Sequence, residues 1–167
     1  MRDLLVYYRW PLVTFLLTAI LGFAARSAIG RVYGAAEAVD LLNALSRAGL
    51  YLGSAIGSAS ATIIALMLTL VGMIRRMDED FDQNAYRDVA MVGRLSAITL
   101  LVALFLLMAF ALPIGEFEEL PGAWFENVYN ALFAGTIVMV GLSAATVVLI
   151  YTTLLRVMAK ITPGDDV

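Results

Sequence analysis

One uncharged stretch decides the fold, residues 48–74, which reads AGLYLGSAIGSASATIIALMLTLVGMI. A helix needs about 20 apolar residues to cross roughly 30 Å of hydrocarbon, so this stretch is long enough to span a bilayer. Three further uncharged runs lie at residues 10–25, 95–115 and 127–155. They lack the alternation of barrel strands and are too long for them. The sequence therefore predicts an all-α membrane protein, a bundle of four transmembrane helices.

The composition agrees with lipid as the surrounding solvent. Hydrophobic residues make up 62% of the 167 residues and charged residues only 15%, whereas a soluble domain carries about 25% charged residues. A soluble fold of this size could not hide so much apolar surface. We expect a single transmembrane domain over residues 1–167, with its spans at about residues 8–29, 49–74, 93–113 and 127–155.

The second and third helices are expected to extend beyond the bilayer. Residues 35–48 form an amphipathic segment, with Val39, Leu42 and Leu45 on one side and charged residues on the other. This segment either lies flat on the outer surface or extends the second span, with Gly49 as the expected bend. On the inner side, Asp80 or Asp82 is expected to cap the third helix.

The lysines and arginines predict the orientation. Four spans place eight of them on the side of the two termini and three on the other side. The positive-inside rule then puts both termini in the cytoplasm. Short loops indicate a bacterial-type inner membrane. The eight inner residues are Arg2, Arg9, Arg75, Arg76, Arg87, Arg94, Arg156 and Lys160, and the three outer ones are Arg26, Arg31 and Arg47.

Several chemistries lack their usual residues. The chain contains no histidine and no cysteine. Histidine is the commonest side-chain ligand of transition metals, and cysteine is the nucleophile of thiol catalysis. The only lysine of the chain, Lys160, lies at the predicted cytoplasmic end, so a Schiff base within a span is excluded. No phosphate loop or dinucleotide fingerprint is present. We therefore expect a protein that is not an enzyme and holds no cofactor or metal, and the balanced inner charges favour no nucleic acid.

A run of small residues marks one face of the second span, at Gly49, Gly53, Gly57 and Ala61. Small side chains let helix backbones approach closely in lipid. The run therefore predicts close packing, either against another span of the same chain or against a second copy. Gly135 and Gly141 in the fourth span are the expected counterpart within the chain.

A line of hydroxyl side chains runs beside that face, at Ser54, Ser58, Thr62 and Thr69. Such a line can contact water and a permeating ion in a narrow pore. The alternative is that each hydroxyl bonds to a carbonyl of its own helix or bridges two helices.

The predicted outer connection is acidic, with Glu116, Glu118, Glu119 and Glu126 and no basic residue nearby. In a symmetric oligomer these residues would form rings that concentrate cations at a channel mouth. The alternative is a solvated loop that obeys the orientation rule. Arg26 is expected to reach the headgroups or to pair with Glu116 or Glu119.

Two hypotheses for function follow. The first is a homo-oligomeric ion channel that favours cations. The second is a non-catalytic accessory or scaffold subunit of a larger membrane complex. In both, the expected partners are the lipid bilayer and either a further copy of the chain or another membrane subunit.

Overall fold

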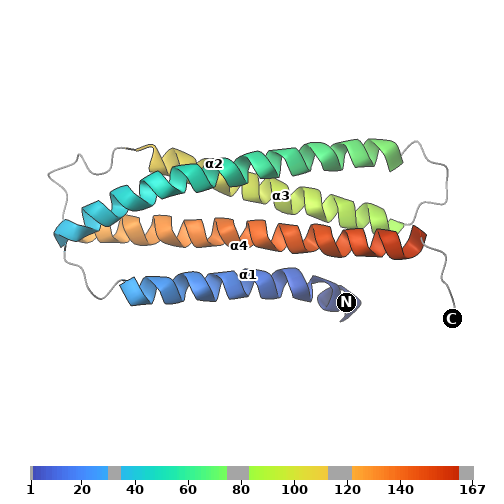
Figure 1. The fold of residues 1–167 in the computed structure, drawn as a ribbon, viewed down its shortest axis with the longest axis horizontal. Coiled ribbons are helices and arrows are strands. Elements are labelled where there is room, and N and C mark those ends of the chain that lie inside the picture. Colours follow the sequence, from blue (N-terminus) through green and yellow to red (C-terminus); the bar gives the residue numbers. More distant parts are fainter. Residues whose placement is uncertain (1, 30–34, 75–82, 113–121, 162–167) are drawn as a thin grey trace.

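The computed structural model describes residues 2–29, 35–74, 83–112 and 122–161. They form four helices, which lie side by side along one axis (Figure 1): α1 (Arg2–Ile29), α2 (Ala35–Ile74), α3 (Gln83–Phe110) and α4 (Gly122–Ile161). All four are long and apolar enough to cross a membrane. This confirms the predicted all-α class with four membrane-length helices and indicates a multi-pass membrane protein.

The amphipathic segment before the second span belongs to α2, which is a single helix from Ala35 to Ile74 (Figure 1). Leu42 is only 1% exposed and packs in the core beside Phe110, while Asp40 and Arg47 are exposed. Leu42 and the partly buried Leu45 thus pack against the rest of the protein, so the segment extends the span instead of lying apart. The proposed caps of the third helix, Asp80 and Asp82, lie outside the described residues.

The four helices do not contribute equally to the bundle. α2, α3 and α4 contact one another, whereas α1 contacts α4 and, among the described residues, neither α2 nor α3. A helix with one neighbour needs no polar side, because lipid covers the rest of it. The sequence of α1 fits this position, since large apolar side chains are exposed around it: Trp10, Leu12, Val13, Leu16, Leu17, Ile20, Leu21 and Phe23.

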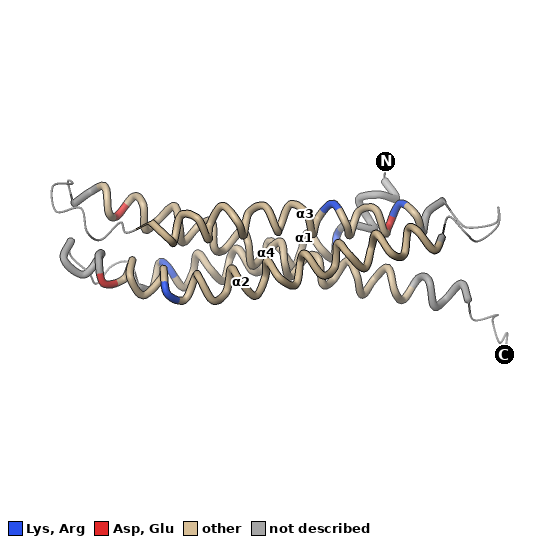
Figure 2. The backbone as a smooth tube through the Cα atoms, turned by 90° about the horizontal axis from the view of Figure 1, so that it is seen from above, with Lys and Arg blue, Asp and Glu red and all other residues tan. Residues whose placement is uncertain are grey.

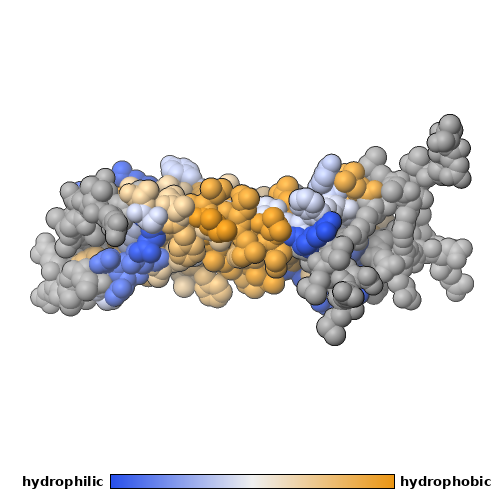
Figure 3. All heavy atoms as spheres, turned by 90° about the horizontal axis from the view of Figure 1, so that it is seen from below, coloured by the Kyte–Doolittle hydropathy of each residue, from blue (hydrophilic) through white to orange (hydrophobic). Residues whose placement is uncertain are grey.

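The core lies between α2, α3 and α4. Side chains of all three helices meet in one cluster, formed by Leu42, Ile56, Ala103, Leu106, Phe110, Leu132 and Met139. Around it, the exposed surface of the helices is hydrophobic in the middle and hydrophilic toward both ends (Figure 3). The charged residues of the described helices lie on either side of an uncharged middle (Figure 2). This distribution matches a hydrocarbon layer between two headgroup layers.

Candidate functional site

The glycines of α2 face α3 within the same chain. Gly49 lies against the ring of Phe110, and a Cβ on Gly53 would lie 3.0 Å from Leu107 Cδ2. Gly57 has more room, because a Cβ there would lie 3.8 Å from the Cβ of Ala103. Large side chains of α3 therefore fill the space that the α2 glycines leave.

The expectation that glycines of the fourth span form the counterpart is wrong. Gly135 of α4 lies against Leu106 of α3, and Gly141 lies against Phe15 of α1. Each glycine thus receives a bulky side chain from a different helix, so no glycine of α4 faces a glycine of α2 among the described residues. Sequence spacing shows that a small residue allows close approach, but it does not show which helix approaches.

Ala61, the last member of the predicted packing run, lies on the exposed side of α2. The buried side continues instead through Ser60, which is 4% exposed. The repeat of four residues drifts around a helix of 3.6 residues per turn, so the run leaves the α3 contact after Gly57.

The four predicted pore-lining residues are all exposed, on the side of α2 away from α3. Ser54 Oγ donates to the carbonyl of Leu50 at 2.7 Å, and Thr62 Oγ1 donates to that of Ser58 at 2.9 Å. Thr69 Oγ1 makes the same kind of bond, to Ala65 at 3.0 Å. Any path that these hydroxyls line therefore runs outside a single copy of the chain.

We define the free face of α2 as the exposed residues Ser54, Ala55, Ser58, Ala61, Thr62 and Ala65. Large side chains are exposed only beyond its two ends, for example at Tyr51 and Leu66. The exposed surface of α1 is the opposite case between Trp10 and Phe23, where large apolar side chains predominate. Small and hydroxyl residues are enriched where membrane helices contact each other. The free face therefore has the composition of a helix contact, whereas the surface of α1 has that of a lipid contact.

A second group of hydroxyls is buried in the bundle, and the sequence reasoning did not distinguish it from the other hydroxyls of the spans. It consists of Ser60, Ser96, Thr99 and Thr146. Thr99 and Thr146 donate to carbonyls four residues back, at 2.9 Å and 2.8 Å. Ser96 Oγ is fully buried and makes no hydrogen bond within the described part of the chain. These hydroxyls could not be distinguished in sequence from the exposed ones, because both kinds lie in apolar helices.

The arginines near the membrane ends of α1 have partners of two kinds. Arg26 is partly buried and donates from Nη2 to Oδ1 of Asn130 on α4. Its expected partners, Glu116 and Glu119, lie outside the described residues. At the other end, Arg9 Cζ lies 5.8 Å from the centre of the Trp10 ring, a cation–π distance. Asn130 was missed because a neutral amide in an apolar run gives no charge signal.

Of the four predicted acidic residues, the structure describes Glu126, which is exposed near the start of α4. Glu116, Glu118 and Glu119 lie outside the described residues. Within the described ranges, no cluster of three or more histidine, cysteine, aspartate or glutamate side chains is placed to hold a metal ion.

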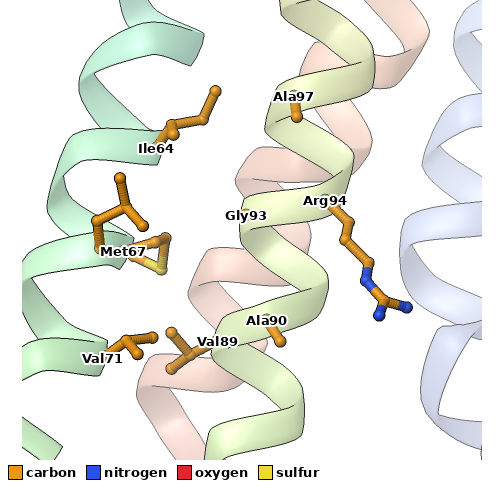
Figure 4. Close-up of a pocket in the computed structure, with 9 residues that line it drawn as sticks. Ile64, Met67, Val71, Val89, Ala90, Gly93, Arg94 and Ala97 are labelled. Atoms are coloured by element: carbon orange, nitrogen blue, oxygen red, sulfur yellow. The ribbon is translucent and has the colours of Figure 1, made fainter.

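An apolar groove of about 320 Å³ separates α2 and α3 near the end where α2 stops (Figure 4). It is lined by Ile64, Met67, Leu68 and Val71 of α2 and by Val89, Ala90, Gly93, Arg94 and Ala97 of α3. The Arg94 side chain points away from the groove, so the groove is lined by apolar side chains (Figure 4).

Comparison of this chain with protein-family models, with curated proteins and with solved structures gives no match.

Proposed function

We propose that the protein assembles with further copies of itself through the free face of α2, and that the assembly is an ion channel that favours cations. The observation that carries the proposal is the composition of this face. It lies in the middle of a membrane-length helix, it is exposed, and it holds only alanine, serine and threonine.

The physical reason for assembly through this face is the way in which membrane helices associate in lipid. Lipid tails are as apolar as leucine, so membrane helices associate through close van der Waals contact and hydrogen bonds instead of the hydrophobic effect. The glycines of α2 are already occupied by α3. The free face is thus a second small-residue surface on the same helix, and a second copy is the partner that is always present at equal concentration.

The chemistry of the hydroxyls favours cations. Ser54, Thr62 and Thr69 each use their hydrogen on a carbonyl of their own helix. A hydroxyl oxygen that donates still has lone pairs that accept. In an assembly in which the free faces of several copies meet around a common axis, the oxygens of Ser54 and Thr62, and that of Thr69 beyond the face, would therefore present partial negative charge. Glu126 and its three acidic neighbours in the sequence would add negative charge at one mouth.

The orientation completes the proposal. Eight lysines and arginines on the side of the termini, against three on the other, support cytoplasmic termini in a bacterial-type inner membrane. The glutamates then face the outside, where they would meet cations that enter the cell.

A second candidate, an accessory or scaffold subunit without catalysis, is favoured by the same hydrogen bonds. Because Ser54 and Thr62 of the free face donate to carbonyls within α2, these two hydroxyls need no water as a hydrogen-bond acceptor. The free face could therefore pack against a helix of a different membrane protein.

The test uses the absence of cysteine from the chain. Single-cysteine proteins Ser58→Cys and Ala24→Cys are purified and reconstituted in liposomes, and potassium flux is measured before and after a charged thiol reagent. Ala24 is the control because it is exposed on α1. We expect flux from both proteins and at least tenfold inhibition by the reagent only for Ser58→Cys.

Flux without selective inhibition would contradict the assignment of α2 to the path. If neither protein conducts potassium although the assembly is intact, the channel hypothesis is contradicted and the accessory-subunit hypothesis is favoured.

A further inference from the structure

The apolar surface of the molecule has two different lengths. At a rise of about 1.5 Å per residue, Arg9 and Arg26 of α1 lie about 25 Å apart, with no charged residue between them. α3 likewise has about 25 Å of uncharged helix between Arg94 and its end at Phe110. By the same measure, α2 between Arg47 and Ile74 is uncharged over about 40 Å.

The uncharged runs of α1 and α3 are shorter at only one end of the bundle. The contacts between helices show which end this is. Gly93 of α3 lies beside Met67 of α2, where a Cβ would approach the Met67 Cβ to 3.9 Å. Arg94 is therefore level with Leu66, and α2 continues without a charge for about 12 Å beyond it.

α1 and α4 show the same step. Phe15 of α1 lies against Gly141 of α4. Counting along both helices from this contact, at about 1.5 Å per residue, puts Arg9 level with the α4 residues near Val147. α4 then remains uncharged for about 12 Å, as far as Leu155.

The longer runs carry exposed apolar side chains in this extra length. Met73 of α2 is 61% exposed, and Tyr151 and Leu154 of α4 are also exposed. At the corresponding level, α3 carries Arg87, which is exposed. A flat bilayer boundary cannot keep the apolar side chains of α2 and α4 in hydrocarbon and the arginines of α3 in water at the same time. If it passed the end of α2, it would bury Arg94 and Arg87 in hydrocarbon, and if it passed Arg94, it would expose Met73 and Leu154 to water.

We propose that the bilayer is thinned on one side of this protein: at the Arg94 end, phospholipid headgroup phosphates come about 12 Å closer to the membrane centre along α1 and α3 than along α2 and α4. Arg9 and Arg94 are the phosphate-binding side chains of the thinned side. The change in level occurs at two boundaries: between α2 and α3, at the apolar groove described above, and between α4 and α1.

Two properties of Arg94 point to a headgroup as its ligand. Its side chain runs away from α2 and from the level of Ala97 toward that of Ala90, which is toward the first residues of α3 (Figure 4). Arginine stays charged in proteins and binds phosphate through its fork of donors. A charged arginine in hydrocarbon is costly, and thinning of the bilayer is one of the ways in which that cost is lowered.

The experiment compares two labelled positions at the same level. Single-cysteine variants Tyr86→Cys on α3 and Met73→Cys on α2 carry a nitroxide in the full-length protein, reconstituted in phosphatidylcholine and phosphatidylglycerol vesicles. Tyr86 is 44% exposed and Met73 61% exposed, so both sites accept a label. Collision with oxygen reports hydrocarbon, and collision with a water-soluble nickel complex reports water.

We expect the label at position 73 to collide mainly with oxygen and the label at position 86 mainly with the nickel complex, a difference in depth of about 12 Å. Equal depths would overturn the proposal, whether both labels lie in hydrocarbon or both in water.

A second measurement tests the role of Arg94 itself, with a nitroxide at Ile98→Cys, which is exposed one turn farther into the apolar region. Arg94→Leu should move this label deeper into hydrocarbon by about one helical turn, roughly 5 Å. Arg94→Lys keeps the charge and should leave its depth unchanged. An unchanged depth in Arg94→Leu would show that Arg94 does not hold the headgroups there.

Discussion

At the scale of single residues, the α2 glycines differ in the room that they have. Gly49 lies against the buried ring of Phe110, closer than a real Cβ could stand, whereas Gly57 has only ordinary contacts at 3.8 Å. Overpacking of a core typically costs about 1–3 kcal/mol. We therefore expect Gly49→Ala to lower the free energy of unfolding in detergent by about that amount.

Gly57→Ala is the matched control, because it makes the same change eight residues farther along the same helix. Alanine favours helix over glycine by about 1 kcal/mol in water-soluble hosts, so we expect Gly57→Ala to be neutral or stabilising. Titration with a denaturing detergent, followed by circular dichroism, compares the two. Equal losses of stability would contradict the α2–α3 contacts described here.

The bond between Arg26 and Asn130 joins α1 to its only described neighbour, α4. Asn130→Leu leaves a partly buried charge without this acceptor, and hydrogen bonds to charged groups contribute about 1.5–3 kcal/mol. We expect a loss of that size in Asn130→Leu. The double variant Arg26→Leu/Asn130→Leu should recover part of it, because two apolar groups then replace the pair.

Additive losses in this double-mutant cycle, measured by the same denaturation, would show that the two side chains do not interact.

At the scale of the helices, hydropathy was enough to predict each element, because the need for about 20 apolar residues is local to each span. The faces could not be predicted in the same way. A residue that faces lipid and a residue that faces another helix can both lie in an apolar run. The sequence therefore does not show that α3 covers Gly53 but leaves Ser58 exposed. The packing of α1 on α4 alone was likewise unpredictable from hydropathy.

The free face gives a prediction at this scale. Ala61→Leu adds a large side chain on the free face, and Ala24→Leu makes the same change on the exposed surface of α1. Neither residue is buried, so both monomers should fold. We expect Ala61→Leu to reduce the assembly to monomers in mild detergent and Ala24→Leu to leave it unchanged, as measured by light scattering. If only Ala24→Leu abolishes assembly, the contact between copies lies on α1 and not on the free face of α2.

Leucine at Gly53 or Gly57 would not test the contact between copies, because both glycines lie against α3. Leucine there would disturb the monomer, and a smaller assembly would not identify a contact between copies.

At the scale of the whole molecule, the distribution of charge makes a prediction about orientation. With eight basic residues on the side of the termini, a green fluorescent protein fused after Val167 should fluoresce in a bacterial host, and alkaline phosphatase at the same site should be inactive. Active phosphatase would reverse the orientation and place the acidic residues at the inner mouth.

The central claim is that copies of the chain meet through the free face of α2, and cysteine crosslinking in the membrane tests it most directly. Each residue from 54 to 65 is replaced in turn by cysteine, and disulfide-linked dimers are measured after mild oxidation. We predict strong crosslinking at Ser54, Ser58, Ala61 and Ala65, and little at the buried Ile56 and Ser60. Equal crosslinking around the helix, or strong crosslinking at Ile56 and Ser60 alone, would contradict the claim.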